Sequence, residues 1–497
     1  MVRPFTSRPP RRAVALCALL VSAGLSACDD DGDSPPGGTI AREALLDSKN
    51  CQVCHPTHYD QWAASMHAYA AEDPVFIAMN RRGQRETGGA LGSFCVNCHA
   101  PMAVREGLTT DGLNLAQVPE AYRGVTCTFC HSIESVTGTH NAQVALAKDA
   151  PFAMLGPIAD PIATAFHGSR YAPTMDSTRT EAAAACGACH DIVNQQGTHI
   201  ERTYAEWQGT VFARIEAGVG CASCHMLGSD GEAAEGTGVV RRIHDHGFPG
   251  VDVALTPWPG KEEQRRGIER DLGNAIQAAL CYDERNRKIE VVLDNAGVGH
   301  AWPSGAAQDR RAWLEVTAYQ GQDVIYQSGV VPAGTAVEDL QDPDLLLIRD
   351  CIFDATGKSA HMFWEAASVA SNLLAGPAPP TPAMPVPMGA HVRWELPVAG
   401  SGRQLPAVPD RIAMRVRIKP VGDEVLRDLV ASGDLDAAIA AAVPTIDVPN
   451  TAIEWTLPKV NFTETTRGTT LLCVAPPRFR SAATTLAVSH ARCVGAP

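Results

Sequence analysis

The chain has 497 residues, of which 45% are hydrophobic and only 6% are aromatic. A mean hydropathy of −0.07 excludes a polytopic membrane protein. The formal net charge of −14 excludes the basic surface that nucleic-acid binding needs.

The N-terminus has the pattern of an export signal. Four arginines precede the apolar run Ala13–Gly24, which is too short to span a bilayer, so residues 1–27 are predicted to be a signal peptide. The ending LSAC resembles a bacterial lipoprotein signal, in which Cys28 is lipidated; the alternative is an ordinary cleavage site. Residues 28–44 form an acidic, Gly- and Pro-rich stretch, predicted to be a flexible tether. Removing the signal leaves 37 basic and 55 acidic residues, a net charge of −18.

Five copies of Cys-x-x-Cys-His are distributed over residues 45–250. This motif attaches c-type haem: both thiols form thioethers with the haem vinyl groups, and the histidine binds iron from the proximal side. Structural disulfides, zinc sites and redox dithiols do not explain a histidine in every copy. The motif residues are Cys51, Cys54 and His55; Cys95, Cys98 and His99; Cys127, Cys130 and His131; Cys186, Cys189 and His190; and Cys221, Cys224 and His225.

The spacing of the motifs predicts a single compact domain. The stretch Cys51–His246 leaves only about 40 residues for each haem, too few for five separate haem domains. We therefore expect five covalently attached haems to pack against one another over residues 45–250 and to form the domain core themselves. Such close packing suits electron transfer between haems.

Other histidines are candidates for the distal iron ligands. His67 lies in a predicted helix directly after the first motif, and His167 lies between Phe166 and Gly168. Of His244 and His246, one is expected to be a ligand, and Gly247 favours His246 because it permits close backbone approach. His300, in the loop VGHAWPSG, is equally consistent with a ligand and with a surface histidine.

Four distal candidates for five haems leave one position open. That position needs His244, His140, His199 or no histidine at all. His58, three residues after His55, is expected at a haem edge or in solvent. His361, His391 and His490 lie outside the haem region and are expected to be structural or exposed.

After Gly250 the sequence has no further haem motif, and strand patterns become frequent. A linker with a helix over 260–280 is predicted in residues 251–287, followed by a β-rich domain over 288–497. The predicted fold class is therefore α+β: a mostly helical multihaem domain followed by an antiparallel β-sandwich-like domain. Strands are predicted at 288–294, 312–319, 324–331, 391–398, 411–420 and 451–457. The segments between them are predicted to include a hairpin turn at 320–323, a Pro-rich loop at 376–389 and short helices at 424–433 and 434–443.

Four cysteines remain in the β-rich part. An even number in an oxidising compartment suggests two disulfides, and sequence proximity favours Cys281–Cys351 with Cys473–Cys493 among three possible pairings. Free thiols are the alternative.

The haem region resembles the multihaem cytochromes of the c-554 type. The resemblance rests on CQVCH with YDQWAASMHA, FCVNCHAPMA, GVTCTFCHSIE, CGACHDIVN with TYAEWQGT, and CASCHM, and it covers roughly residues 50–250. It implies distal ligation by His67, His167 and His246. GHAWPSG matches an element at the start of the β-rich domain of many multihaem cytochromes, which implies that His300 is a ligand too.

Two functional hypotheses follow. The first is a lipid-anchored electron carrier in the cell envelope, facing the periplasm, that passes single electrons between a quinol-linked donor and other cytochromes or a terminal reductase. The second is an oxidoreductase that acts on a small nitrogen or sulfur compound, such as nitrite or hydroxylamine, at one five-coordinate haem. A membrane contact is expected only through the lipid anchor, and no nucleic-acid partner is expected.

Overall fold

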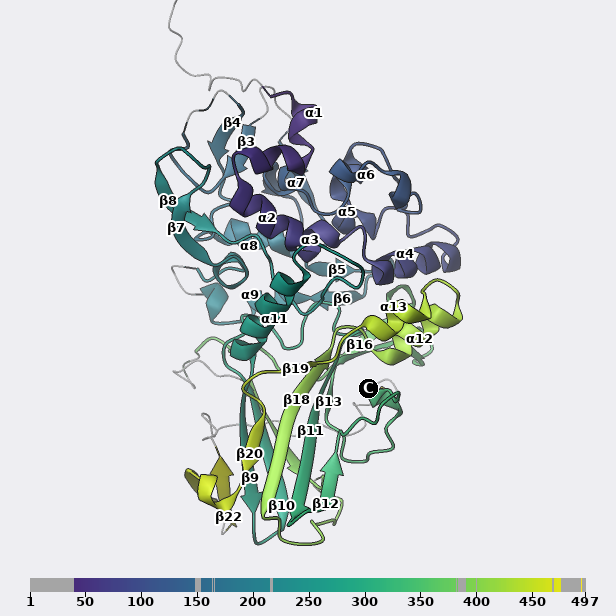
Figure 1. Ribbon diagram of the computed structural model, residues 1–497. Coiled ribbons are helices and arrows are strands. Elements are labelled where there is room, and N and C mark those ends of the chain that lie inside the picture. Colours follow the sequence, from purple (N-terminus) through teal and green to yellow (C-terminus); the bar gives the residue numbers. More distant parts are fainter. Residues whose placement is uncertain are drawn as a thin grey trace, which may run out of the picture.

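The computed structural model describes residues 40–147, 153–162, 164, 166–214, 218–380, 382, 390–398, 400–466, 469–474 and 493. The predicted signal peptide and Cys28 lie outside the described residues. Figure 1 shows a helix-rich part above a part built of long antiparallel strands, with helix α11 between them. The predicted α+β fold class is confirmed.

The N-terminal part consists of short helices joined by long loops. Its α-helices are α1 (Arg42–Leu45), α2 (Pro56–Ala64), α3 (Met66–Tyr69), α4 (Pro74–Glu86), α5 (Val96–His99), α6 (Pro101–Arg105), α7 (Cys127–Cys130), α8 (Thr180–Gly187), α9 (Thr203–Gln208) and α10 (Ala222–His225). Four two-stranded sheets accompany them: β1 (Ile133–Val136) with β2 (Val144–Leu146), β3 (Ala153–Gly156) with β4 (Gly168–Tyr171), β5 (Asp191–Val193) with β6 (His199–Arg202), and β7 (Gly228–Glu232) with β8 (Val240–His244).

Each Cys-x-x-Cys-His motif lies on or beside a helical turn. The second, third and fifth motifs coincide with α5, α7 and α10, the fourth overlaps the end of α8, and the first overlaps the 3-10 helix Ser48–Val53. Residues three apart on a helical turn face the same side, so both cysteines of a motif can reach one haem. Apolar contacts in this part form several small clusters rather than one core.

The C-terminal part is a sandwich of two sheets. One has the order β17-β10-β9-β22-β21; the other has the order β12-β11-β18-β19, with β13 and β20 also paired to it. In β18 every second residue is buried, the pattern of a strand with one face on a core. The strands are β9 (Gln277–Asp283), β10 (Lys288–Asn295), β11 (Arg311–Gln320), β12 (Asp323–Ser328), β13 (Leu347–Ile348), β17 (Ala390–Leu396), β18 (Arg411–Lys419), β19 (Ile446–Asp447), β20 (Ile453–Trp455), β21 (Phe462–Thr466) and β22 (Thr469–Val474).

The main hydrophobic core lies between these two sheets. It contains Leu280, Val291 and Trp394 from the first sheet and Leu314 and Val416 from the second. Helix α11 (Lys261–Ala275) adds buried side chains to the same core. A smaller three-stranded sheet, β15 (Ser359–Ala360), β14 (Asp350–Phe353) and β16 (Ser368–Ser371), lies beside the sandwich.

The linker helix is shorter than predicted. It ends at Ala275, and the following residues form strand β9, which pairs with β10 and β22. The stretch Gln277–Leu280 is rich in alanine and favours a helix locally, but pairing with two neighbouring strands outweighs that weak propensity. The sheet therefore begins inside the segment predicted as a linker. The other predicted strands and the turn at 320–323 are present, although strands 324–331 and 451–457 are shorter than expected.

The predicted disulfide pairing is wrong. The bonds join Cys281 to Cys473 and Cys351 to Cys493. Cys281 on β9 and Cys473 on β22 face each other in the register of two adjacent strands that are 192 residues apart in sequence. Pairing by proximity along the chain fails because the sheet brings together strands from opposite ends of the domain.

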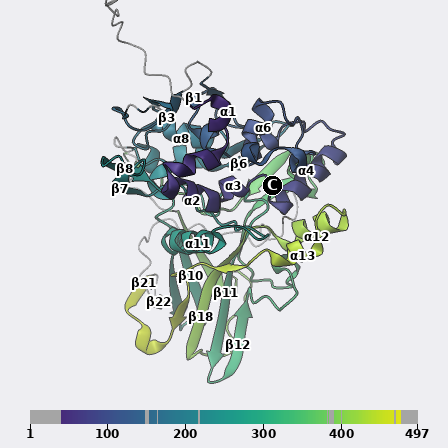
Figure 2. The same cartoon turned by 45° about the horizontal axis from the view of Figure 1, so that its top comes forward.

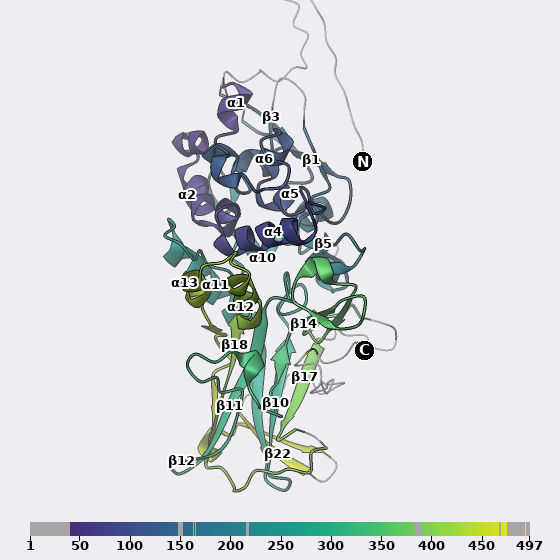
Figure 3. The same ribbon diagram turned by 90° about the vertical axis from the view of Figure 1, so that its right-hand side faces the viewer.

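Two further helices join the sandwich to the N-terminal part. Residues of α12 (Asp423–Ala431) and of the α13 region (Ala437–Ala442) pack with Val75, Ala78 and Leu91. Figures 2 and 3 show α11, α12 and α13 grouped where the two parts meet. Glu424 at the start of α12 binds both Arg311 and Arg349, and Arg311 is completely buried. This ion cluster connects α12 to the sandwich.

Candidate functional site

Four of the five proximal histidines face a second histidine ring. Two imidazoles that bind one iron from opposite sides, each through a bond of about 2 Å, have ring centres about 6 Å apart. The observed centroid distances are 6.2 Å for His55–His167, 6.2 Å for His67–His190, 6.3 Å for His131–His246 and 6.4 Å for His225–His300. The spacing fits one haem iron between the two rings of each pair.

Most of these rings are oriented by a hydrogen bond to a backbone carbonyl. The Nδ1 atom of His131 lies 2.6 Å from the Leu155 oxygen, and that of His225 lies 2.9 Å from the Pro249 oxygen. On the opposite side, His300 Nδ1 lies 2.7 Å from the Ala301 oxygen. A proton held at Nδ1 leaves the Nε2 lone pair free for a metal. Corresponding contacts hold His55, His99, His167 and His246.

The protonation state of the rings also suits iron binding. Burial is the largest cause that lowers the pKa of His67 and His246 to about 3 and that of His300 to about 4. These imidazoles are therefore neutral at pH 7, the form that binds metals.

His99, in the second motif, has different surroundings. Phe76 stacks on its ring, with centroids 3.8 Å apart and planes inclined by 3°. Burial lowers the pKa of His99 to about 4, and its Nδ1 lies 3.0 Å from the Ala70 oxygen. Among the described residues, no histidine ring faces His99 at the distance seen in the other four motifs.

The remaining histidines lie elsewhere. His244 Nδ1 contacts the Met226 oxygen at 2.8 Å, and its Nε2 lies 3.5 Å from Ser177 Oγ. The rings of His140 and His199 lie 6.4 Å from each other, and neither belongs to a Cys-x-x-Cys-His motif. His58 lies between the first and third motifs. Its ring centroid is 5.0 Å from that of His246 and 6.2 Å from that of His55, but it is only three residues from His55 and its ring is nearly perpendicular to both.

Histidines beyond the haem region have the structural or peripheral positions expected for them where they are described. His361 Nδ1 lies 2.6 Å from Asp428 Oδ2 on α12. His391 is on β17, and His490 lies outside the described residues.

The His300 loop is fastened to helix α9 of the N-terminal part. Glu206 accepts hydrogen bonds from the Ala301 backbone at 3.2 Å and from the Ser304 hydroxyl at 2.7 Å. Thr203 Oγ1 lies 2.8 Å from the same Ser304 hydroxyl. The loop therefore positions His300 over His225 through contacts that cross the boundary between the two parts.

Cysteines of different motifs meet in the interior. Thiol contacts join Cys51 to Cys127, Cys98 to Cys189 and Cys186 to Cys221. Cys130 is near Cys186 and Cys189. The third motif thus neighbours the first and fourth, and the fourth also neighbours the second and fifth. None of the ten motif cysteines forms a disulfide.

Comparisons with known proteins bear on the family and on the fold. The family model described as cytochrome c554 and c-prime matches residues 50–132. A solved structure, that of a penta-heme cytochrome c552 from Thermochromatium tepidum, aligns with a TM-score of 0.55 at 18% identity and covers 85% of this chain and 100% of that chain. Curated protein sequences give no match.

The five Cys-x-x-Cys-His motifs, together with the family match over the first three of them, support a multihaem c-type cytochrome. The chain resembles the c554 family over its first motifs, and its fold resembles that of the penta-heme protein over most of its length. The family match supports covalently bound haem and a role in electron transfer or related redox chemistry. Within the described ranges, no helix of the cytochrome is both long and apolar enough to cross a membrane.

The cytochrome has one feature near the second motif that sequence reasoning missed. Glu201 on β6 interacts electrostatically with Cys98, and burial, opposed by Arg310, raises its pKa to about 7. Nothing in the sequence around Glu201 distinguishes it from a surface glutamate, because its burial depends on how β6 packs.

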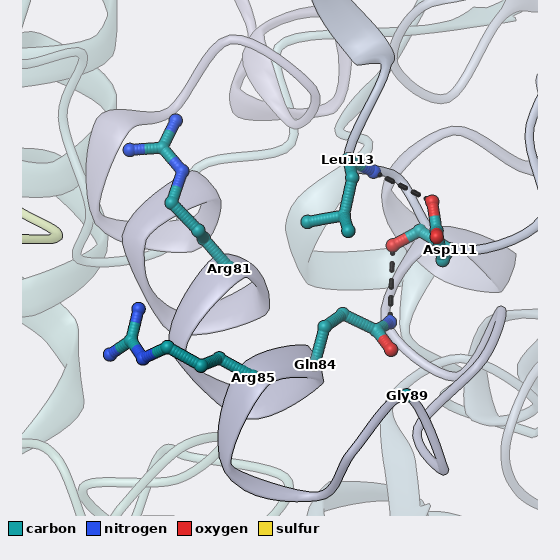
Figure 4. A pocket seen from close by; sticks show the side chains of 6 residues that line it. All are labelled: Arg81, Gln84, Arg85, Gly89, Asp111 and Leu113. Atoms are coloured by element: carbon teal, nitrogen blue, oxygen red, sulfur yellow. Dashed lines mark hydrogen bonds between the residues drawn. The ribbon is translucent and has the colours of Figure 1, made fainter.

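A hollow of about 370 Å³ on the outer side of α4 does not belong to the haem sites. It is lined by Arg81, Gln84, Arg85, Gly89, Asp111 and Leu113, and Figure 4 shows Gln84 bonded to Asp111. Arg85 is paired with Asp434 at 2.6 Å. The hollow contains neither histidine nor cysteine, so haem attachment does not involve it.

Proposed function

We propose that the protein is an exported pentahaem electron-transfer cytochrome, anchored by a lipid on Cys28, with four bis-histidine haems and one haem that has a single histidine ligand. The observation that carries this proposal is the set of four histidine pairs at 6.2–6.4 Å, each containing one motif histidine. His67, His167, His246 and His300 are then the distal ligands, and His244 is not a ligand.

The bound haems supply a one-electron iron couple, whereas the protein supplies position and environment. The paired histidines would hold the iron from both sides, and backbone carbonyls keep most of these imidazoles in one orientation. The cysteines that neighbour one another across motifs would bring neighbouring haems close together. They define a path from the first motif through the third to the fourth, with branches to the second and fifth.

Two measurements test this assignment. A pyridine haemochrome assay should give five haems per chain, and EPR of the oxidised protein should show four low-spin haems and one high-spin haem. Five low-spin signals would show that the second haem has a sixth ligand. Fewer than four would contradict the proposed histidine pairs.

A second candidate function is catalysis at the second haem. It is favoured by the surroundings of His99, which has a phenylalanine stacked on its ring and no facing histidine among the described residues. A small ligand such as nitrite or hydroxylamine could bind on the side opposite His99. Glu201, with a pKa of about 7, could then exchange protons near neutral pH.

Ligand binding distinguishes the two candidates. If the second haem is catalytic, nitrite or hydroxylamine should shift the high-spin EPR signal, and Glu201→Gln should lower turnover without changing that shift. A high-spin signal that does not respond to either compound leaves electron transfer as the function. We propose quinol-linked proteins, other cytochromes or a terminal reductase as redox partners.

A further inference from the structure

Two histidines outside the haem motifs form a pair with the spacing of a metal site. The rings of His140 and His199 have centroids 6.4 Å apart and planes inclined by 61°. The pair His67–His190, at 6.2 Å and 57°, has nearly the same geometry. Neither His140 nor His199 belongs to a Cys-x-x-Cys-His motif, so this pair has no haem of its own.

Both rings have nitrogen atoms that a ligand can use. His140 Nε2 lies 3.3 Å from the amide nitrogen of Gln143. Across the described ranges, His140 Nδ1 and both ring nitrogens of His199 have no hydrogen-bond partner. In three of the haem pairs, by contrast, a backbone carbonyl occupies one nitrogen of each ring. A metal ion could therefore bind one nitrogen of each ring without displacing a protein contact.

A strained loop holds His140 in this position. His140 lies in the turn between β1 and β2, and the two residues after it, Asn141 and Ala142, have φ angles of 54° and 59°. Left-handed backbone is uncommon in residues other than glycine, and it persists only where the surrounding contacts enforce it. Strain of this kind is concentrated at functional sites.

The contacts that enforce this backbone connect the loop to the second histidine. Asn141 donates from Nδ2 to the Val193 oxygen at 2.8 Å and accepts from the Val193 backbone N–H at 3.0 Å. Val193 on β5 is paired with His199 on β6. The Ala142 backbone N–H donates to the oxygen of Ala188, which lies within the fourth motif. The two histidines are thus held against each other and beside that motif.

The surroundings favour a cation bound between two imidazoles. Asp191, whose side chain is buried, interacts electrostatically with His199. Two imidazoles on opposite sides of one ion have ring centres about 6 Å apart, whereas a tetrahedral ion such as zinc would bring them to about 5 Å. Opposed imidazoles suit square-planar or octahedral ions, and among divalent ions of the first transition row copper(II) binds nitrogen ligands most tightly.

We propose that His140 and His199 form a binding site for an exchangeable copper(II) ion beside the fourth haem motif. One nitrogen of each imidazole binds the ion, and Asn141 is a positioning residue that keeps His140 turned toward His199. Among the described residues no third His, Cys, Asp or Glu side chain completes the site, so water fills the other coordination positions and the ion can exchange. The inference uses no haem ligand and does not depend on the proposed function.

The test uses the oxidised holoprotein and copper(II) sulfate up to one equivalent. Isothermal titration should show one site, and EPR should show, beside the haem signals, a copper signal split by two imidazole nitrogens. His140→Ala and His199→Ala should each lower the affinity about a hundredfold and remove the two-nitrogen splitting. His361→Ala, which removes a histidine that contacts Asp428 in the C-terminal part, is the matched control and should bind copper as the wild type does.

Asn141→Gly tests the positioning of His140. Glycine keeps the left-handed backbone but removes both side-chain bonds to Val193, so copper should bind about tenfold more weakly with the two-nitrogen splitting retained. Haem content and the haem EPR signals should be the same in every variant, which shows that the fold is intact. Equal copper affinity in wild type, His140→Ala and His199→Ala, or no binding by the wild type, would overturn the site.

Discussion

His300 is held in place by neighbours in its own loop and in strand β10. Asn295 donates to its carbonyl oxygen at 2.8 Å, and its own Nδ1 contacts the Ala301 oxygen. The ring lies almost parallel to that of His225, at an angle of 12°. One side chain from the β-rich part thus completes the surroundings of the fifth motif.

Substitution of this ligand should therefore change one haem only. We predict that His300→Ala converts the fifth haem from low-spin to high-spin, because no other histidine ring lies opposite His225 among the described residues. EPR and the near-infrared charge-transfer bands measure the change. His199→Ala is the control, since that ring faces His140 rather than a motif histidine, and it should leave the spectrum unchanged. A low-spin fifth haem in His300→Ala would refute the assignment.

At the scale of an element, the partly buried carboxylate of Glu424 connects α12 to the sandwich. Burial alone would raise the pKa of Glu424, but Arg311 and Arg349 outweigh that effect and lower it to about 2. Both arginines are at least 95% buried. Arg311 also binds Glu338 at 2.6 Å, whereas Arg349 pairs with Glu424, so Glu424 supplies part of the charge compensation of both.

We predict that Glu424→Gln lowers the free energy of unfolding of the C-terminal part by about 3 kcal/mol at pH 7, because two buried guanidinium groups lose their shared carboxylate. A glutamate with a depressed pKa stabilises above its ordinary pKa of about 4.3 and loses this effect as the pH falls toward 2. The difference between wild type and variant, measured by urea unfolding, should therefore shrink below about pH 4. Glu262→Gln, which removes an exposed carboxylate on α11, should change stability by less than about 0.5 kcal/mol.

The pairing of β9 with β22 gives a prediction about the disulfides. Proteolytic digestion without reduction should yield peptides that link Cys281 to Cys473 and Cys351 to Cys493. Mass spectrometry identifies them directly. A Cys473–Cys493 peptide would contradict the bond between Cys281 on β9 and Cys473 on β22, because Cys473 can form only one disulfide.

How far the sequence predicts these elements depends on whether the signal is local. Strand β18 alternates buried and partly exposed residues along its length, so it is recognisable from hydrophobicity alone. Strand β9 is not, because its alanines favour a helix until β10 and β22 pair with it. The motif histidines are adjacent to their cysteines, whereas the choice between His244 and His246 depends on which ring reaches His131.

At the scale of the whole molecule, the two parts differ in what holds them together. The sandwich has one large apolar core drawn from both sheets and α11, whereas the haem-bearing part has only small clusters. Short helices with so little apolar contact do not offset the entropy of ordering the chain. Haem itself is expected to supply most of the missing interior.

We accordingly predict that the protein exported without haem, in a host lacking cytochrome c maturation, is only partly folded. Limited proteolysis should remove residues up to about 250 and leave a resistant fragment that starts near α11, with both disulfides intact. The holoprotein under the same conditions should resist cleavage throughout the haem region. Equal resistance of the two parts without haem would show that the small clusters suffice.

The four proposed histidine pairs have a topological consequence. They close loops over residues 55–167, 67–190, 131–246 and 225–300, and each loop overlaps the next. Every peptide bond from His55 to His300 then lies inside at least one loop closed through iron. A single cut of the backbone in that interval would leave both sides attached through at least one iron. The metal centres would therefore join the N-terminal part to the sandwich independently of the polypeptide backbone.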